Sequence, residues 1–215
     1  MAVVADSVQE RLRDEQVLAV IRAGSAAEAV QAGRALAEGG VRALEVAFTT
    51  PDAAAAIGEL AADPELFVGA GTVLSGAQAH AAIDAGAAFL VSPSLVPDAL
   101  AVAREAGVLA LPGALTPTEV VAAAEQAEVV KLFPASLGGV SYLKALLAPL
   151  PELRIVPTGG VSAANASEWL AAGAFAVGAG GDLCPPALIA EGRFDELTRR
   201  ARGYREALGT GEAAR

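Results

Sequence analysis

The sequence predicts an α/β protein built as a single (β/α)8 TIM barrel over residues 1–215, with one extra helix before the first strand and one after the last. Two observations predict this fold. Eight short apolar runs recur along the chain, and each is followed by an alanine-rich stretch with helical periodicity. The same alternation also fits an open doubly wound sheet, which is the second interpretation.

The eight predicted strands are, in chain order, VLAVIR (17–22), ALEVAF (43–48), LFVGAGTV (66–73), FLVSPS (89–94), VLALPGA (108–114), VVKLFPA (129–135), RIVPTGG (154–160) and FAVGAGG (175–181). The stretches between them begin at Ser, Thr or Pro and stop at glycine, as helices do. Helical segments before residue 17 and after residue 193 would flank the barrel. GAG at 69–71 lacks the third glycine of a dinucleotide fingerprint, so no nicotinamide cofactor is expected.

Composition argues against several classes of function. The formal net charge of -10 disfavours nucleic acid as a partner. Cys184 is the only cysteine and His80 the only histidine, so a disulfide, a cysteine nucleophile with a histidine base and a His-based metal site are not expected. There is no apolar run of membrane-spanning length and no signal-peptide pattern, which indicates a cytoplasmic protein without a membrane partner.

Two charged residues are predicted to face the barrel interior. Side chains alternate along a strand, and the bulky Leu44 and Val46 would face the helices, so Glu45 between them would point inward. By the same alternation Lys131 points inward from the sixth strand. The two strands have the same parity, so Glu45 and Lys131 can share one layer of the barrel.

Lys131 is the candidate catalytic group. The chain has only one other lysine, Lys144, which falls in a helical stretch. Burial among apolar neighbours disfavours an ammonium, and a neutral lysine amine is a nucleophile toward carbonyl carbon. The alternative is a buried ion pair with Glu45 and no chemistry, although such a pair is a poor source of stability. The preferred hypothesis is a metal-free, Schiff-base aldolase acting on a small 2-keto acid.

Glycine clusters predict a phosphate site at the ends of strands seven and eight. Thr158, Gly159 and Gly160 precede one helix, and Gly180 and Gly181 precede the next. Glycine lets backbone approach an anion closely, and a helix N-terminus supplies N–H donors. The alternative is that these glycines only form tight turns and bind no anion.

Two further polar residues lie at strand ends near the proposed site. Arg22 ends the first run and Thr72 follows the glycines of the third. Either residue could bind a carboxylate, Arg22 through a bidentate pair of hydrogen bonds. A solvated Arg22 with no ligand is the alternative.

The motifs LEVAFTTP, VGAGTVL, SPSL, LPGALTPTE, VKLFPASLGG and PTGGVS, in this order, resemble the 2-keto-3-deoxy-6-phosphogluconate (KDPG) aldolases from about residue 16 onward. That family includes 4-hydroxy-2-oxoglutarate (KHG) aldolases and 2-keto-3-deoxy-6-phosphogalactonate aldolases. The resemblance implies a homotrimeric class I aldolase without a metal or cofactor, which releases pyruvate. It implies that Lys131 forms the imine, Glu45 moves protons, Thr72 holds the carboxylate, and Gly159, Gly160 and the strand-eight turn hold the phosphate.

The chain departs from the family pattern at several positions. Thr49 stands where phosphogluconate enzymes often have Arg, whereas phosphogalactonate enzymes have an Arg at the end of strand one, where Arg22 lies. Arg22 is therefore the expected replacement for the carboxylate ligand. Thr158 matches the gluconate enzymes, Gly181 replaces a serine of some members, and Ser94 replaces a common glycine.

The preferred function is cleavage of KDPG to pyruvate and glyceraldehyde 3-phosphate. KHG aldolase and phosphogalactonate aldolase are alternatives with the same chemistry. A phosphosugar isomerase or epimerase would use the carboxylates without an imine, but it leaves the position of Lys131 unexplained. A non-catalytic barrel that binds a sugar phosphate is a further alternative.

Overall fold

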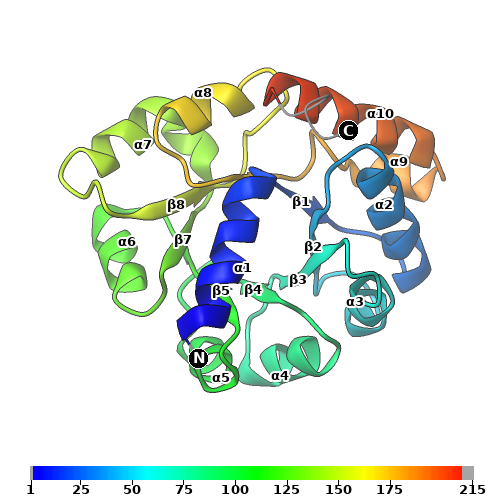
Figure 1. Cartoon of the computed structure of the whole chain (residues 1–215), viewed down its shortest axis with the longest axis horizontal. Coiled ribbons are helices and arrows are strands. Elements are labelled where there is room, and N and C mark those ends of the chain that lie inside the picture. Colours follow the sequence, from blue (N-terminus) through cyan, green and yellow to red (C-terminus); the bar gives the residue numbers. More distant parts are fainter. Residues whose placement is uncertain (1, 210–215) are drawn as a thin grey trace.

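Strands and helices alternate along the chain, and the helices surround the strands (Figure 1). The structure, a computed structural model, describes residues 2–209. The strands are β1 (Val17–Ile21), β2 (Ala43–Ala47), β3 (Phe67–Gly71), β4 (Phe89–Val91), β5 (Leu109–Leu111), β6 (Gly113–Ala114), β7 (Val129–Leu132), β8 (Arg154–Pro157) and β9 (Val177–Ala179). The helices are α1 (Ala2–Glu15), α2 (Ala26–Glu38), α3 (Ala53–Ala61), α4 (Gly76–Asp84), α5 (Pro97–Ala106), α6 (Pro117–Ala124), α7 (Gly139–Leu147), α8 (Ala166–Ala171), α9 (Pro186–Ala190) and α10 (Phe194–Ala207), with a 3₁₀ turn, η1 (Ala135–Leu137), before α7.

The strands form two parallel sheets. One sheet is curled and has the order β5-β4-β3-β2-β1-β9, and the other has the order β6-β7-β8. A parallel bridge between Thr158 and Gly178 joins the end of β8 to β9. All pairs are parallel, as expected for strands connected by helices.

The fifth predicted strand is wrong in one respect. Residues 108–114 were expected to form one continuous strand, but Pro112 divides them into β5 and β6, which belong to different sheets. Proline has no N–H to donate to a ladder, so regular pairing stops there. The Pro112 carbonyl still accepts a hydrogen bond of 2.9 Å from the Lys131 N–H. Each of the other seven predicted runs contains one strand.

Helix starts follow the capping residues in the sequence. Ser25 accepts a hydrogen bond from the Glu28 N–H at the start of α2, and Ser75 accepts one from the Gln78 N–H at the start of α4. Thr116 and Glu119 form a reciprocal capping box at the start of α6. Among residues 2–209, no helix is long and apolar enough to cross a bilayer.

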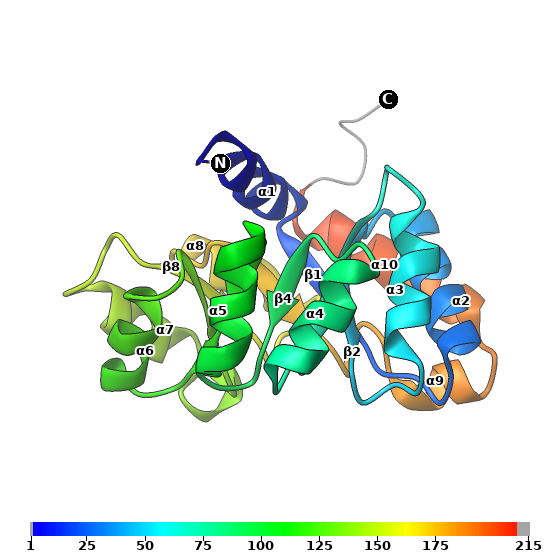
Figure 2. The same ribbon diagram turned by 90° about the horizontal axis from the view of Figure 1, so that it is seen from below.

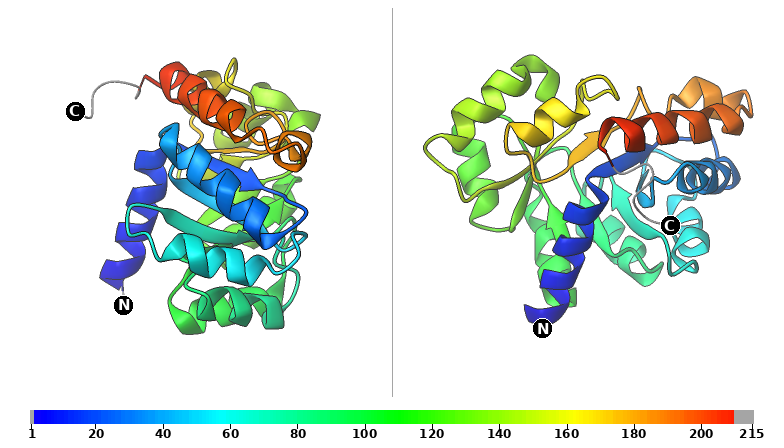
Figure 3. Two further views of the ribbon diagram at one scale, coloured as in Figure 1. Left: turned by 90° about the vertical axis from the view of Figure 1, so that its right-hand side faces the viewer. Right: turned by 45° about the horizontal axis from the view of Figure 1, so that its top comes forward.

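Apolar side chains on the two faces of the strands form two separate clusters. Leu44, Val46 and Val130 belong to the outer cluster, between strands and helices. Ala43 and Val129 belong to the inner cluster. The predicted inward and outward alternation of these strands is therefore confirmed. Figure 3 shows the outer layer from two sides, where α10 lies beside α2.

Helix α1 lies across the amino ends of the strands (Figure 2). Its Leu12 is fully buried in the inner cluster, together with Leu18, Phe67 and Phe89 from the first half of their strands. Large side chains thus fill the amino half of the interior. Polar side chains that point inward lie nearer to the carboxyl ends.

Candidate active site

Glu45 and Lys131 meet inside the protein, as the alternation predicts. The Lys131 Nζ lies 3.6 Å from the Glu45 Oε1, and their side chains are only 5% and 1% exposed. Each stands two residues beyond a member of the inner cluster, Ala43 on β2 and Val129 on β7. The pair therefore lies one layer nearer to the carboxyl ends than the apolar filling.

The Glu45 carboxylate is held in a tight space without hydrogen bonds. Within the described residues neither carboxylate oxygen has a hydrogen-bond partner. A Cβ added to Gly71 would lie 2.6 Å from the Glu45 Cγ and would collide with the carboxylate. Glycine at the end of β3 thus makes room for Glu45. A buried carboxylate with unused lone pairs beside an amine is suited to accept and return a proton.

Thr72 directly follows this glycine and has an unusual backbone. Its φ of 56° lies in the left-handed region, which residues other than glycine seldom adopt. The side chain is half-buried at the end of β3. Strained backbone of this kind is concentrated at functional sites. Thr72 directly follows Gly71, the glycine that makes room for Glu45, and so lies at the end of β3.

The lining of a cavity of about 370 Å³ brings together Arg22 and the four glycines predicted to bind phosphate, whereas neither Glu45 nor Lys131 lines it. The other lining residues are Val20, Phe133, Thr158, Val161, Ser162 and Asp182. Gly159 and Gly160 have φ of 91° and 79°, so their conformation requires glycine. Backbone that is not covered by side chains is well suited to approach an anion.

Phe133 connects the two parts of the site. Its ring lines the cavity, and its centroid lies 5.4 Å from the Lys131 Nζ. Arg22 is exposed, and its Nη1 would lie 3.5 Å from a Cβ at Gly180. Thr72 does not line this cavity. Arg22 thus lies with the glycines, and not with the other residue that was expected to bind the carboxylate.

The sequence reasoning missed three residues of this region. Thr50 is buried, and its hydroxyl accepts a 3.1 Å hydrogen bond from the Ala23 N–H, which ties the loop that follows Arg22 to the loop after β2. Ser162 and Asp182 line the cavity. Ser162 ends the PTGGVS motif, so its position was a usable signal, whereas the sequence has no comparable signal for Thr50 or Asp182.

Cys184 has no nucleophilic character in this setting. Burial raises the pKa of its thiol to about 12, although the nearby Arg22 opposes the shift. The thiolate, which is the reactive form, is therefore scarce near neutral pH.

Known proteins resemble the chain in sequence and in structure. The family model "KDPG and KHG aldolase" matches residues 8–200. A 2-dehydro-3-deoxy-phosphogluconate aldolase of Treponema pallidum is 38% identical over 89% of this chain and 93% of its own length. The KHG/KDPG aldolase of Escherichia coli K12 is 37% identical over 91% and 93%.

A solved KDPG aldolase of Legionella pneumophila superposes with a TM-score of 0.83 at 28% identity, over 92% of this chain and 97% of that one. That structure is described as holding pyruvate captured at low pH as a covalent carbinolamine intermediate. The similarity therefore extends from sequence motifs to the whole α/β arrangement.

Proposed function

The chain belongs to the KDPG and KHG aldolase family, and from that premise we propose that it cleaves KDPG to pyruvate and glyceraldehyde 3-phosphate through an imine on Lys131. It is a carbon–carbon lyase. One observation carries the proposal: a buried amine lies 3.6 Å from a buried carboxylate that has no hydrogen-bond partner among the described residues. This arrangement supplies a nucleophile and a proton carrier in one water-poor space.

Imine formation uses both groups of the pair. Transfer of the ammonium proton to Glu45 leaves a neutral Lys131 amine, which is the nucleophilic form. The amine attacks C2 of the keto acid, and the carbonyl oxygen receives the proton from Glu45. Loss of that oxygen as water gives the protonated imine.

Cleavage then uses the imine as an electron sink. Glu45 takes the proton from the C4 hydroxyl, the C3–C4 bond breaks, and its electron pair moves into the imine to form an enamine. The aldehyde leaves, and C3 of the enamine is protonated. Water then hydrolyses the imine, which releases pyruvate and regenerates Lys131.

We propose that the phosphate binds to backbone N–H groups around Gly159, Gly160, Gly180 and Gly181, with Thr158 beside them. Arg22 would then contact the phosphate, because it lines the same cavity as these glycines. The proposed partner of Arg22 is therefore the phosphate, whereas the sequence led us to expect the keto-acid carboxylate. Thr72 is the proposed carboxylate ligand. The bidentate fork of an arginine suits phosphate as well as carboxylate.

Borohydride trapping tests the chemistry. Incubation with pyruvate, reduction and peptide mass spectrometry should find the adduct on Lys131. The Lys131→Arg variant should form no adduct, whereas Lys144→Arg, which changes the exposed lysine of α7, should form it normally. A wild-type protein without an adduct on Lys131 would overturn the mechanism.

A substrate panel tests the anion ligands. KDPG should be preferred over 4-hydroxy-2-oxoglutarate, which has no phosphate, and over the phosphogalactonate derivative. Arg22→Ala should raise the KM for KDPG about tenfold or more, as expected for loss of a charged hydrogen bond. Its apparent affinity for pyruvate should be unchanged. A large loss of pyruvate affinity would instead identify Arg22 as the carboxylate ligand.

We further propose that the chain is one cytoplasmic domain, that its sheets close into one (β/α)8 barrel, and that it assembles as a homotrimer. Closure is supported by the single residue, Pro112, between β5 and β6 and by the Thr158–Gly178 bridge between β8 and β9. Light scattering should give three times the mass of the 21.4 kDa chain. A monomeric mass would refute the trimer.

A further inference from the structure

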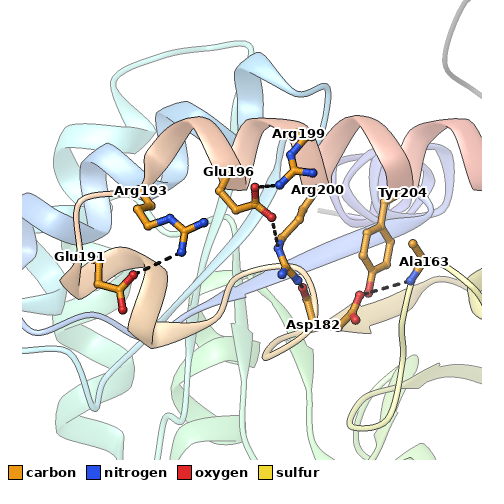
Figure 4. A network of polar contacts seen from close by, with 8 residues as sticks. All are labelled: Ala163, Asp182, Glu191, Arg193, Glu196, Arg199, Arg200 and Tyr204. Carbon is orange, nitrogen blue, oxygen red and sulfur yellow. Dashed lines mark hydrogen bonds and ion pairs between the residues drawn. The ribbon is translucent and has the colours of Figure 1, made fainter.

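Asp182 joins the two glycine loops through a polar network (Figure 4). It follows Gly181 in the loop between β9 and α9. Its Oδ2 accepts a hydrogen bond of 3.3 Å from the Ala163 N–H, in the loop between β8 and α8. The same oxygen accepts a hydrogen bond of 2.9 Å from the Tyr204 hydroxyl on α10. We call Asp182, Ala163 and Tyr204 the loop clamp.

The loop clamp lies where the strands no longer hold the loops together. The Thr158–Gly178 bridge pairs the two chains at the strand ends. Beyond this bridge, and within residues 2–209, the two loops are joined by the hydrogen bond from the Ala163 N–H to the Asp182 carboxylate. Glycine loops are conformationally free, so their N–H groups converge on one anion only if something fixes the loops relative to each other.

Tyr204 anchors the clamp to the body of the protein. Its side chain is only 1% exposed, and its hydroxyl also lies 3.3 Å from the Val161 carbonyl of the first loop. Burial, together with the Asp182 carboxylate, raises the pKa of Tyr204 above its usual value, so the hydroxyl keeps its proton and remains a donor. A buried helix residue thus reaches both loops.

Arg200 fixes the second loop from the same helix. Its Nη1 donates a 2.5 Å hydrogen bond to the Asp182 carbonyl, and its Nε donates a 3.1 Å hydrogen bond to Glu196. The backbone and the side chain of Asp182 are therefore both held by α10. Neither interaction involves Lys131 or Glu45, so the network belongs to the phosphate end of the cavity.

We propose that Asp182 is a positioning residue for the phosphate site, which it serves by holding the Gly159–Gly160 and Gly180–Gly181 loops at the spacing that a phosphate requires. The inference rests on the proposed function. This role is unusual for an aspartate, because Asp182 lines the cavity and its carboxylate carries the same sign of charge as the phosphate. A carboxylate that only repelled phosphate would weaken binding, so its removal would strengthen binding. Positioning predicts the opposite effect.

Three variants and one control test the positioning role. In Asp182→Ala the KM for KDPG should rise about fivefold to tenfold, the effect of one hydrogen bond to a charged group. The kcat and the KM for unphosphorylated 4-hydroxy-2-oxoglutarate should change less than about twofold. Tyr204→Phe should act in the same direction, and Asp182→Asn should retain most of the affinity, because an amide oxygen also accepts hydrogen bonds. Glu191→Ala removes an exposed carboxylate of the same region that contacts only Arg193 in Figure 4, and should change nothing.

Inhibition by inorganic phosphate gives a second readout that needs no phosphorylated substrate. Phosphate should inhibit the cleavage of 4-hydroxy-2-oxoglutarate, and Asp182→Ala should raise its inhibition constant about as much as the KM for KDPG. An unchanged or lowered KM for KDPG in Asp182→Ala would overturn the proposal, and so would an equal rise for both substrates. Absence of the Lys131 adduct in wild type would instead refute the proposed function, which keeps the two failures distinct.

Discussion

Replacement of Glu45 and Lys131, singly and together, tests whether they form a true buried ion pair in the free protein. The variants are Glu45→Gln, Lys131→Met and the double variant. At 3.6 Å, and with an effective dielectric constant of about 20, two unit charges attract each other by about 4–5 kcal/mol. Loss of one partner leaves the other charge buried and unpaired.

The free energy of unfolding should therefore change in a non-additive way. Each single variant should lose about 3–5 kcal/mol, whereas the double variant should lose less than either, because it buries no unpaired charge. The coupling energy of the cycle should be about 3 kcal/mol or more. Neither side chain has much access to water to compensate, at 5% and 1% exposure.

Urea unfolding at pH 7 measures the free energy of unfolding of the wild type, the two single variants and the double variant. The denaturant slope should be the same for each protein, so that the midpoints report stability alone. Losses that add, with a coupling below about 1 kcal/mol, would show that the amine and the carboxylic acid are already neutral before substrate arrives. That result would refute the ion-pair reasoning and leave the geometry intact.

Three further predictions follow from individual residues. Gly71→Ala should lower kcat about 100-fold, because the new Cβ displaces Glu45. The control Gly58→Ala, whose new Cβ makes only an ordinary contact, should leave kcat unchanged. Equal kcat values for the two variants would show that Gly71 is not needed to make room for Glu45. Because burial raises the pKa of Cys184 to about 12, a thiol reagent at pH 8 should label less than about a tenth of the native protein but all of the urea-unfolded protein. Backbone hydrogen bonds at the start of α6 lower the pKa of Glu119 below its usual 4.5, so its contribution to stability is present above that pH and is lost as the pH falls through the folded pKa. The Tm deficit of Glu119→Ala measured at pH 7 should therefore shrink as the pH is lowered from 4.5 through the folded pKa, and a deficit that stays constant throughout acid titration would refute the assignment.

The inner pair of the site could be predicted because it depends on a local rule. Side chains alternate along any strand, so Leu44 and Val46 determine where Glu45 points. The glycine clusters were also local signals, and the cavity contains them. Strand positions were predicted for the same reason, except where Pro112 interrupts its run.

The missed features depend on contacts between distant segments or on the chain beyond a strand end. Arg22 is the first residue after β1, where alternation no longer determines its direction. Asp182 meets Tyr204 because α10 packs over the loops, and nothing in either local sequence indicates that contact. A single sequence therefore predicts the direction of side chains within the strands, but not the contacts made by the loops that complete the site.

The position of Leu12 has a kinetic consequence. This side chain, with its aromatic neighbours, occupies the amino half of the interior, so we expect the keto acid to reach Lys131 from the carboxyl side. Entry and exit would then share one opening, and the proposed phosphate site would place the aldehyde half toward it. Because cleavage leaves the enamine bound to Lys131, we expect sequential release: the phosphorylated aldehyde departs first, and pyruvate follows. Pyruvate alone can reoccupy the empty enzyme, so it should inhibit competitively with the substrate, whereas the aldehyde should inhibit by recombining with the enamine.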